Sequence, residues 1–146
     1  MSVTVSTLKN GLRVVSDTLP NLETVTVGTW VDVGSRFESA SENGLSHMLE
    51  HMAFKGTKKR SAYDIAEQIE NVGGYLNAYT SREHTTYYAR LLKEDLELGV
   101  DVLSDILQNS TFVQDELERE SGLINQAIDK AETTQDNIVL DSIQQT

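Results

Sequence analysis

The chain has 146 residues, which suffices for one domain with a hydrophobic core. It contains no cysteine, so disulfides and thiolate metal sites are excluded, and any metal must be bound by histidine and carboxylate side chains. Its longest apolar runs have the length of a strand, so the sequence predicts no membrane span.

The net charge of −11 is concentrated in the later part of the chain. Residues 1–60 contain seven Lys/Arg and six Asp/Glu, whereas residues 61–146 contain five Lys/Arg and seventeen Asp/Glu. Such a surface repels nucleic acid and favours cationic partners, basic peptides among them. Solubility alone is the simpler explanation of this charge, and both interpretations stay open.

The first third of the chain has the pattern of β-strands. Alternation predicts a strand at residues 3–7, and Asn10-Gly11 indicates a two-residue hairpin turn before a second strand at residues 12–16. After a turn at Pro20-Asn21, alternating β-branched residues predict a third strand over residues 25–33.

Two helices are predicted next. Residues 45–52 have apolar side chains at helical spacing, and the predicted buried stripe is Leu45, Met48, Leu49 and Met52. A second helix begins after Ser61, which can cap it together with Asp64 three residues later. The apolar face of this second helix comprises Ala62, Ile65, Ala66 and Ile69.

Strand patterns return at residues 75–80 and 85–91, and a short polar turn joins them. Helical spacing then predicts a helix over residues 96–107 and another that begins near Gln114. This order of elements favours an α+β fold, mainly an antiparallel sheet packed against helices, over a regular βαβ repeat.

The five residues from His47 to His51 have the inverted zinc-binding pattern H-x-x-E-H. On a helix, His47 and His51 lie one turn apart on the same face, so their imidazoles can converge on one ion. Glu50 lies beside them, where it can take a proton from a water that zinc has acidified to a pKa of about 7. The alternative is a solvated helix face that happens to hold two His and one Glu.

The segment from Gly44 to Thr57, which contains this pattern, resembles the active-site helix of the pitrilysin and insulin-degrading-enzyme family of zinc peptidases. Within that family, the resemblance is strongest to the β-subunits of processing peptidases and their bacterial relatives. Residues 73–85 and 91–95 also resemble family segments, so the similarity extends over essentially the whole chain.

The resemblance implies a Zn²⁺-dependent endopeptidase that acts on extended peptides, and the acidic charge of residues 61–146 favours basic ones. It implies that His47 and His51 are zinc ligands and that Glu50 is the general base. It also implies that the strand containing Asn77 and Ala78 is an edge strand, which pairs with substrate by β-addition. Without the resemblance, Asn77 would be interpreted as an ordinary polar residue of a strand end.

The third zinc ligand of the family is a glutamate on a later helix. Alignment of residues 118–128 with that helix places Ala127 at the ligand position, and a methyl group cannot bind zinc. We therefore expect weaker zinc binding than in a complete site. Ala127 could be an engineered change, the mark of a natural inactive or altered homologue, or part of a site that another group completes.

Glu120 matches a second family glutamate, which commonly supports the metal site, so we expect it to assist catalysis. It precedes Ala127 by two helical turns, about 10 Å along the axis, so it cannot simply replace the missing ligand. The alternative is an exposed helix acid beside Glu116 and Glu118.

The resemblance further implies that residues 1–146 are the N-terminal part of the first domain of a clamshell peptidase, whose remaining domains are absent from this chain. The expected partners are peptide substrates and a second half or partner subunit of the same family, with no nucleic acid. The expected location is the bacterial cytoplasm, with the mitochondrial matrix as the alternative. A catalytically inactive homologue that serves as a binding or scaffold subunit is the alternative function.

Overall fold

A computed structural model describes the backbone of residues 3–133 and the side chains of residues 3–124. In chain order the described elements are β1 (Val3–Thr7), β2 (Arg13–Asp17), β3 (Thr24–Val31), η1 (Ser35–Phe37), α1 (Leu45–Ala53), α2 (Ala62–Glu70), β4 (Tyr75–Thr80), β5 (Thr85–Leu92), η2 (Lys93–Asp95), α3 (Leu96–Gln108) and α4 (Gln114–Thr133). No helix among residues 3–133 is long and apolar enough to cross a bilayer.

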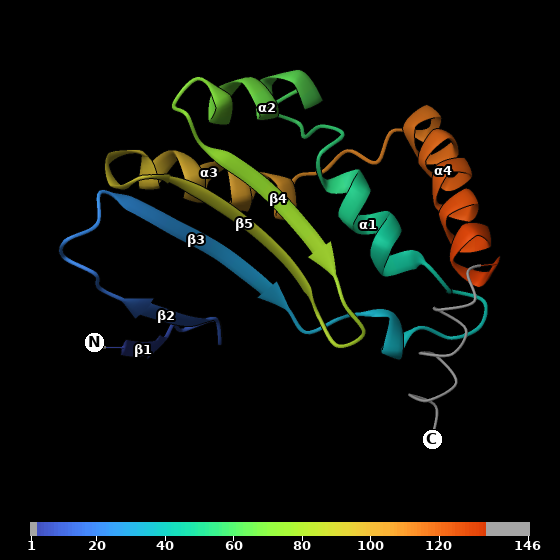
Figure 1. Cartoon of the computed structure of the whole chain (residues 1–146), viewed down its shortest axis with the longest axis horizontal. Helices are drawn as coiled ribbons and strands as arrows, with labels where there is room; N and C mark the ends of the chain where they lie inside the picture. The colour runs from blue at the N-terminus through green and yellow to red at the C-terminus, as the bar shows by residue number, and fades with distance from the viewer. Residues whose placement is uncertain (1–2, 134–146) are drawn as a thin grey trace.

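The main sheet has three antiparallel strands in the order β3-β5-β4 (Figure 1). Tyr87, Ala89 and Leu91 of β5 are buried in the core, whereas Arg90 and Leu92 are exposed. Helix α3 packs on β5 and β3, whereas α1 and α2 pack on β4. The predicted α+β architecture is therefore confirmed, and β4 has β5 as its sole partner among the described strands.

The first two strands form a separate antiparallel hairpin, in which every strand residue is exposed. Its loop differs from the two-residue turn that the sequence predicts. The amide of Leu8 donates to the carbonyl of Leu12, and the amide of Gly11 donates to the carbonyl of Leu8, so three residues lie between the last bonded pair. Gly11 has φ +89°, which is typical of the glycine that ends such a three-residue loop.

Helix α1 is rotated relative to the predicted stripe. Met52 is fully buried, but Leu45 and Leu49 are 47% and 42% exposed, so the prediction that all stripe residues are covered is wrong. The small residues Ser46 and Ala53 are buried instead, which allows α1 to pack closely on its neighbours. Periodicity identifies an apolar side, whereas the packing partners decide which part of that side is covered.

Helix α2 begins as predicted. The Ser61 hydroxyl accepts from the amide of Asp64, and the Asp64 carboxylate accepts from the amide of Ser61, so the capping box is confirmed. Ile65 and Ile69 are each 2% exposed and belong to the core, whereas the predicted face residues Ala62 and Ala66 are exposed.

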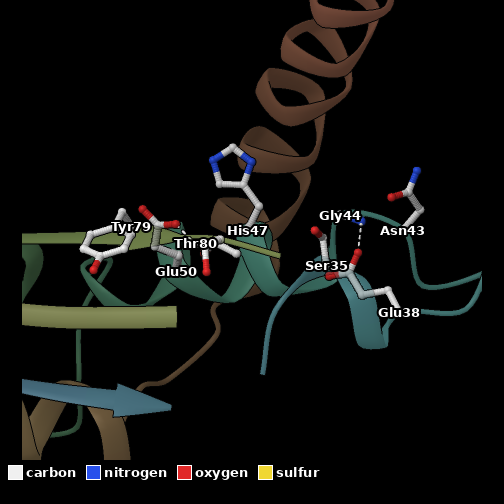
Figure 2. Close-up of a pocket in the computed structure, with 9 residues that line it drawn as sticks. Ser35, Glu38, Asn43, Gly44, His47, Glu50, Tyr79 and Thr80 are labelled. Atoms are coloured by element: carbon white, nitrogen blue, oxygen red, sulfur yellow. Dashed lines mark hydrogen bonds between the residues drawn. The ribbon is translucent and has the colours of Figure 1, made fainter. Parts of the chain in front are cut away.

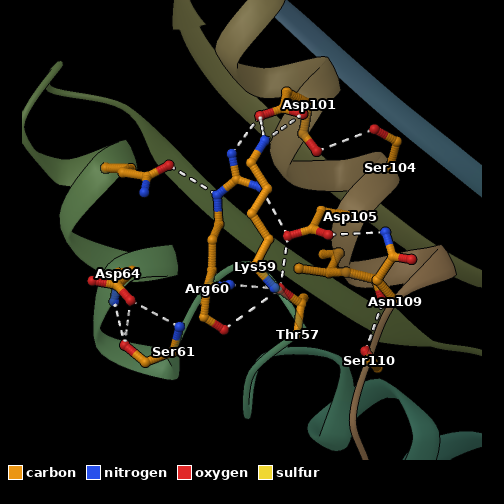
Figure 3. A network of polar contacts seen from close by, with 12 residues as sticks. Thr57, Lys59, Arg60, Ser61, Asp64, Asp101, Ser104, Asp105, Asn109 and Ser110 are labelled. Atoms are coloured by element: carbon orange, nitrogen blue, oxygen red, sulfur yellow. Dashed lines mark hydrogen bonds and ion pairs between the residues drawn. The ribbon is translucent and has the colours of Figure 1, made fainter.

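A buried polar network joins the loop before α2 to α3 (Figure 3). Arg60 Nη1 lies 2.8 Å from Asp105 Oδ2, and both residues are about 5% exposed. Thr57 and Asn109 also donate to the Asp105 carboxylate, at 2.7 and 2.9 Å. Burial raises the pKa of Asp105, but the hydrogen bonds from Thr57, Arg60 and Asn109 outweigh it, so the pKa lies below its usual value.

We predict that Asp105→Asn lowers the free energy of unfolding by about 3 kcal/mol near neutral pH, because Arg60 keeps its charge in a buried site. A carboxyl with a lowered folded pKa stabilises the fold fully above its ordinary value of 3.8, and this contribution is lost as pH falls through the folded pKa. Urea denaturation over a pH series should therefore show the gap between wild type and Asp105→Asn narrowing below pH 3.8. A gap that stays constant with pH would contradict this account. Asp101→Asn changes a half-exposed partner of Arg60 and is the control. It should lower the free energy of unfolding by less than Asp105→Asn does.

Candidate metal centre

A carboxylate from another segment fixes the start of helix α1. Glu38 accepts from the amide of Gly44 at 2.8 Å and from the amide of Ser46 at 2.7 Å, which satisfies two amides at the helix N-terminus. Burial acts to raise the pKa of Glu38, but the hydrogen bonds from Ser46 and Gly44 outweigh it and hold the pKa below its usual value. His47 follows directly, so its backbone position is set by this cap.

The two histidines of α1 converge. The Nε2 atoms of His47 and His51 are 3.0 Å apart, and their rings meet edge to face with centroids 4.6 Å apart. Zinc–nitrogen bonds of 2.0–2.1 Å in a tetrahedral site place two ligand nitrogens about 3.3 Å apart, so a small adjustment suits one ion. Neutral imidazole nitrogens in this arrangement fit zinc.

Glu120 of α4 lies behind His51, away from the facing Nε2 atoms. Its Oε2 is 2.9 Å from His51 Nδ1, and its Oε1 is 2.7 Å from the ammonium of Lys55. A proton on Nδ1, donated to this carboxylate, leaves Nε2 as a metal-binding lone pair. The Lys55 contact, and then the His51 contact, lower the pKa of Glu120 against the effect of burial.

The burial of Glu120 excludes one of the two interpretations of this residue. It is 2% exposed, so the alternative of an exposed helix acid is wrong. Its carboxylate contacts Nδ1 of the His51 ring, whereas Nε2 faces His47.

Glu50 faces a cavity of about 410 Å³ that His47, Tyr79 and Thr80 also line (Figure 2). The hydroxyl of Thr80 donates to Glu50 Oε2 at 2.6 Å. The phenol of Tyr87 is buried near the same carboxylate, and burial together with the negative charge of Glu50 raises its pKa to about 12. Tyr87 is therefore neutral at physiological pH.

The predicted substrate strand is an edge among the described strands. Asn77 of β4 is exposed, and Ala78 is 8% exposed with its side chain toward the helices. The amide of Ala78 donates to Asn77 Oδ1 at 2.8 Å, and Asn77 Nδ2 donates to the Tyr75 hydroxyl. The Ala78 amide is thus capped by a side chain of its own strand.

The third ligand position is not described at the level of side chains. Ala127 lies on α4, but its side chain is outside the described residues. Among the residues whose side chains are described, no three His, Asp or Glu form a cluster that could hold a metal ion.

The sequence did not identify three residues that hold the side chains or the backbone of the candidate site in place: Glu38, Lys55 and Thr80. Lys55 carries a weak signal, since it follows His51 by four residues, although it lies beyond the end of α1. Glu38 and Thr80 carry no local signal, because each contacts α1 from a separate segment.

Comparison with known proteins identifies one family by sequence and a protease of similar fold. Residues 13–146 match the family described as Insulinase (Peptidase family M16). The chain is 51% identical over 142 residues to the mitochondrial-processing peptidase subunit beta of Mus musculus, and equally to that of Homo sapiens. These matches cover 97% of this chain and 29% of each relative, so the chain spans less than a third of their length.

One solved structure extends this comparison to the fold. The crystal structure of a protease from Helicobacter pylori superposes with a TM-score of 0.80 at 32% identity, over 84% of this chain and 30% of that chain.

We predict that Glu120→Gln weakens the α1–α4 junction, because one carbonyl oxygen cannot serve both His51 and Lys55. The free energy of unfolding should fall by about 1–3 kcal/mol. Long-range ¹H–¹⁵N NMR should show the Nδ1–H tautomer of His51 in wild type and a mixture of both tautomers in Glu120→Gln. Glu118→Gln, at an exposed site on the same helix, should change neither quantity. An unchanged tautomer in Glu120→Gln would show that Glu120 does not orient the ring.

Proposed function

Because the chain belongs to the insulinase family, peptidase family M16, we propose that it is a segment of a zinc-dependent metalloendopeptidase of the processing-peptidase type. The observation that carries the proposal is the convergence of the His47 and His51 Nε2 atoms beside the Glu50 carboxylate. Two imidazoles and a nearby base are what hydrolysis of a peptide bond by a zinc site needs.

In this proposal His47 and His51 hold the zinc through Nε2, and Glu120 orients His51. The zinc supplies acidity to water and polarises the scissile carbonyl when it is bound. Glu50 accepts a proton from the attacking water on Oε1, since Thr80 occupies Oε2, and returns that proton to the leaving nitrogen. Tyr87 stays protonated near Glu50.

The substrate in this proposal is an extended peptide that adds to the edge of β4. A carbonyl of the peptide accepts the hydrogen bond that the Ala78 amide now donates to Asn77 Oδ1. The Asn77 side chain is then free to bind the peptide backbone. The excess of acidic residues after position 60 supports basic peptides as the preferred class.

Ala127 limits this chain. At the aligned position of the third ligand it leaves two protein ligands, so we infer weak zinc binding and impaired activity. The second candidate is a catalytically inactive homologue that acts as a binding or scaffold subunit, and Ala127 is the observation that favours it. The preserved geometry of His47, Glu50 and His51 favours the enzyme.

We further propose that residues 1–146 correspond to the N-terminal part of the first peptidase domain and act with a second half or a partner subunit of the family. The word "subunit" in the names of the mouse and human relatives supports a partner. Those names also favour the mitochondrial matrix as the location, whereas the similarity to a Helicobacter pylori protease is compatible with the bacterial cytoplasm.

We predict that Ala127→Glu raises zinc affinity at least tenfold, since it supplies the third protein ligand. Calorimetric titration of zinc into the chain and its Ala127→Glu variant measures this. Cleavage of a basic peptide should rise with zinc content, and Glu50→Gln in the Ala127→Glu background should abolish cleavage while zinc stays bound. Nanomolar zinc binding by the unaltered chain would contradict the inference of a weakened site. If Ala127→Glu leaves both zinc affinity and cleavage at background, the enzyme proposal fails and the result favours an inactive scaffold subunit.

A further inference from the structure

We propose that Thr80 is a positioning residue for Glu50, and that its hydroxyl ties the orientation of the general base to the edge strand β4. This inference rests on the function proposed above, in which Glu50 is the base and β4 binds the peptide. It concerns a residue that no sequence pattern singled out.

The hydrogen bond between Thr80 and Glu50 is short, and no other acceptor shares the Thr80 proton. Thr80 Oγ1 lies 2.6 Å from Glu50 Oε2, which is the range for a hydroxyl that donates to a carboxylate. Two other acceptors, the Ser46 carbonyl and Thr85 Oγ1, are each 3.5 Å away. A hydroxyl has one proton, so it is donated to Glu50.

Thr85 does not compete for this contact. It pairs with Thr80 at the end of the β4–β5 ladder and is 5% exposed. Its own hydroxyl donates to the carbonyl of Val33 at 2.9 Å. Its proton is therefore donated to Val33, and of this pair only Thr80 donates to Glu50.

The strand end that carries Thr80 is held in place by its backbone. The turn after Thr80 closes with the Ser81 amide donating to the His84 carbonyl at 2.9 Å. The Ser81 carbonyl accepts in turn from the Ser35 amide at 3.2 Å. A Cβ at Gly34 would lie 2.4 Å from that carbonyl oxygen, so glycine is what allows the two loops to approach this closely. A hydroxyl on a fixed strand end can hold a carboxylate in one orientation.

The placement of Thr80 connects the base to the substrate strand. Ala78 and Thr80 are two residues apart on β4, so their side chains share the face toward the helices. The strand that offers the Ala78 amide to a peptide therefore also holds Glu50 Oε2. Loss of the hydroxyl should affect the rate of the chemical step, and it should leave zinc binding and peptide binding intact.

The contact is tested first without reference to activity, by a double-mutant cycle on the chain as it exists. Thr80→Val, Glu50→Ala and the double variant are compared by urea denaturation, because Ala at position 50 leaves no acceptor for the Thr80 hydroxyl. We expect a coupling of about tenfold in the unfolding equilibrium constant. Thr80→Ser should retain the coupling with Glu50.

The control is Thr86→Val, the same change at a buried threonine one residue beyond Thr85. Thr86 is 1% exposed, and its Oγ1 has no hydrogen-bond partner within the described part of the chain. Thr86→Val should show no coupling to Glu50→Ala. Absence of coupling at Thr80, or equal coupling at Thr86, would overturn the proposal.

The second arm measures catalysis in the Ala127→Glu chain. Thr80→Val should lower kcat by about tenfold to a hundredfold with KM and zinc affinity unchanged, and Thr80→Ser should recover most of the rate. An unchanged kcat in Thr80→Val, or a Thr80→Ser variant as slow as Thr80→Val, would overturn the positioning role. Complete inactivity of the Ala127→Glu parent would refute the proposed function instead, whereas the cycle still decides whether Thr80 holds Glu50.

Discussion

The buried carboxylate of Glu120 is the contact on which the geometry of the candidate metal centre depends. It is 2% exposed, and one of its oxygens contacts His51 while the other contacts Lys55. An ionised carboxylate in such a place is stable only with partners that compensate its charge. It therefore fixes α4 against α1 and also fixes the His51 ring, which the proposed function uses as a zinc ligand.

The other side of α1 is set by the sheet. Because β5 pairs with both β3 and β4, the end of β4 is a fixed point, and Thr80 reaches from it to Glu50. Glu38 adds a third support at the start of the helix. His47, Glu50 and His51 thus lie on one helix of nine residues, and residues from three other segments orient it. Preorganisation of this kind is what lets a small set of side chains support catalysis.

Much of this could be predicted from the sequence where the signal is local. The strands at Tyr75–Thr80 and Thr85–Leu92 and the capping box at Ser61 follow from alternation and short spacing, and the structure has them. The exposure of Leu45 and Leu49 could not be predicted, because it depends on which neighbours cover α1. The Arg60–Asp105 pair joins residues 45 positions apart, and no local pattern marks such a contact. The zinc-binding pattern could be recognised early because its two histidines are four residues apart on one helix.

The central claim is that His47 and His51 bind one zinc ion through their Nε2 atoms. Zinc K-edge X-ray absorption of the zinc-loaded chain tests it most directly. We expect scattering from two imidazoles with zinc–nitrogen distances of about 2.0–2.1 Å, and its loss on His47→Ala or His51→Ala. A spectrum without imidazole scattering, or one that the two substitutions leave unchanged, would contradict the claim.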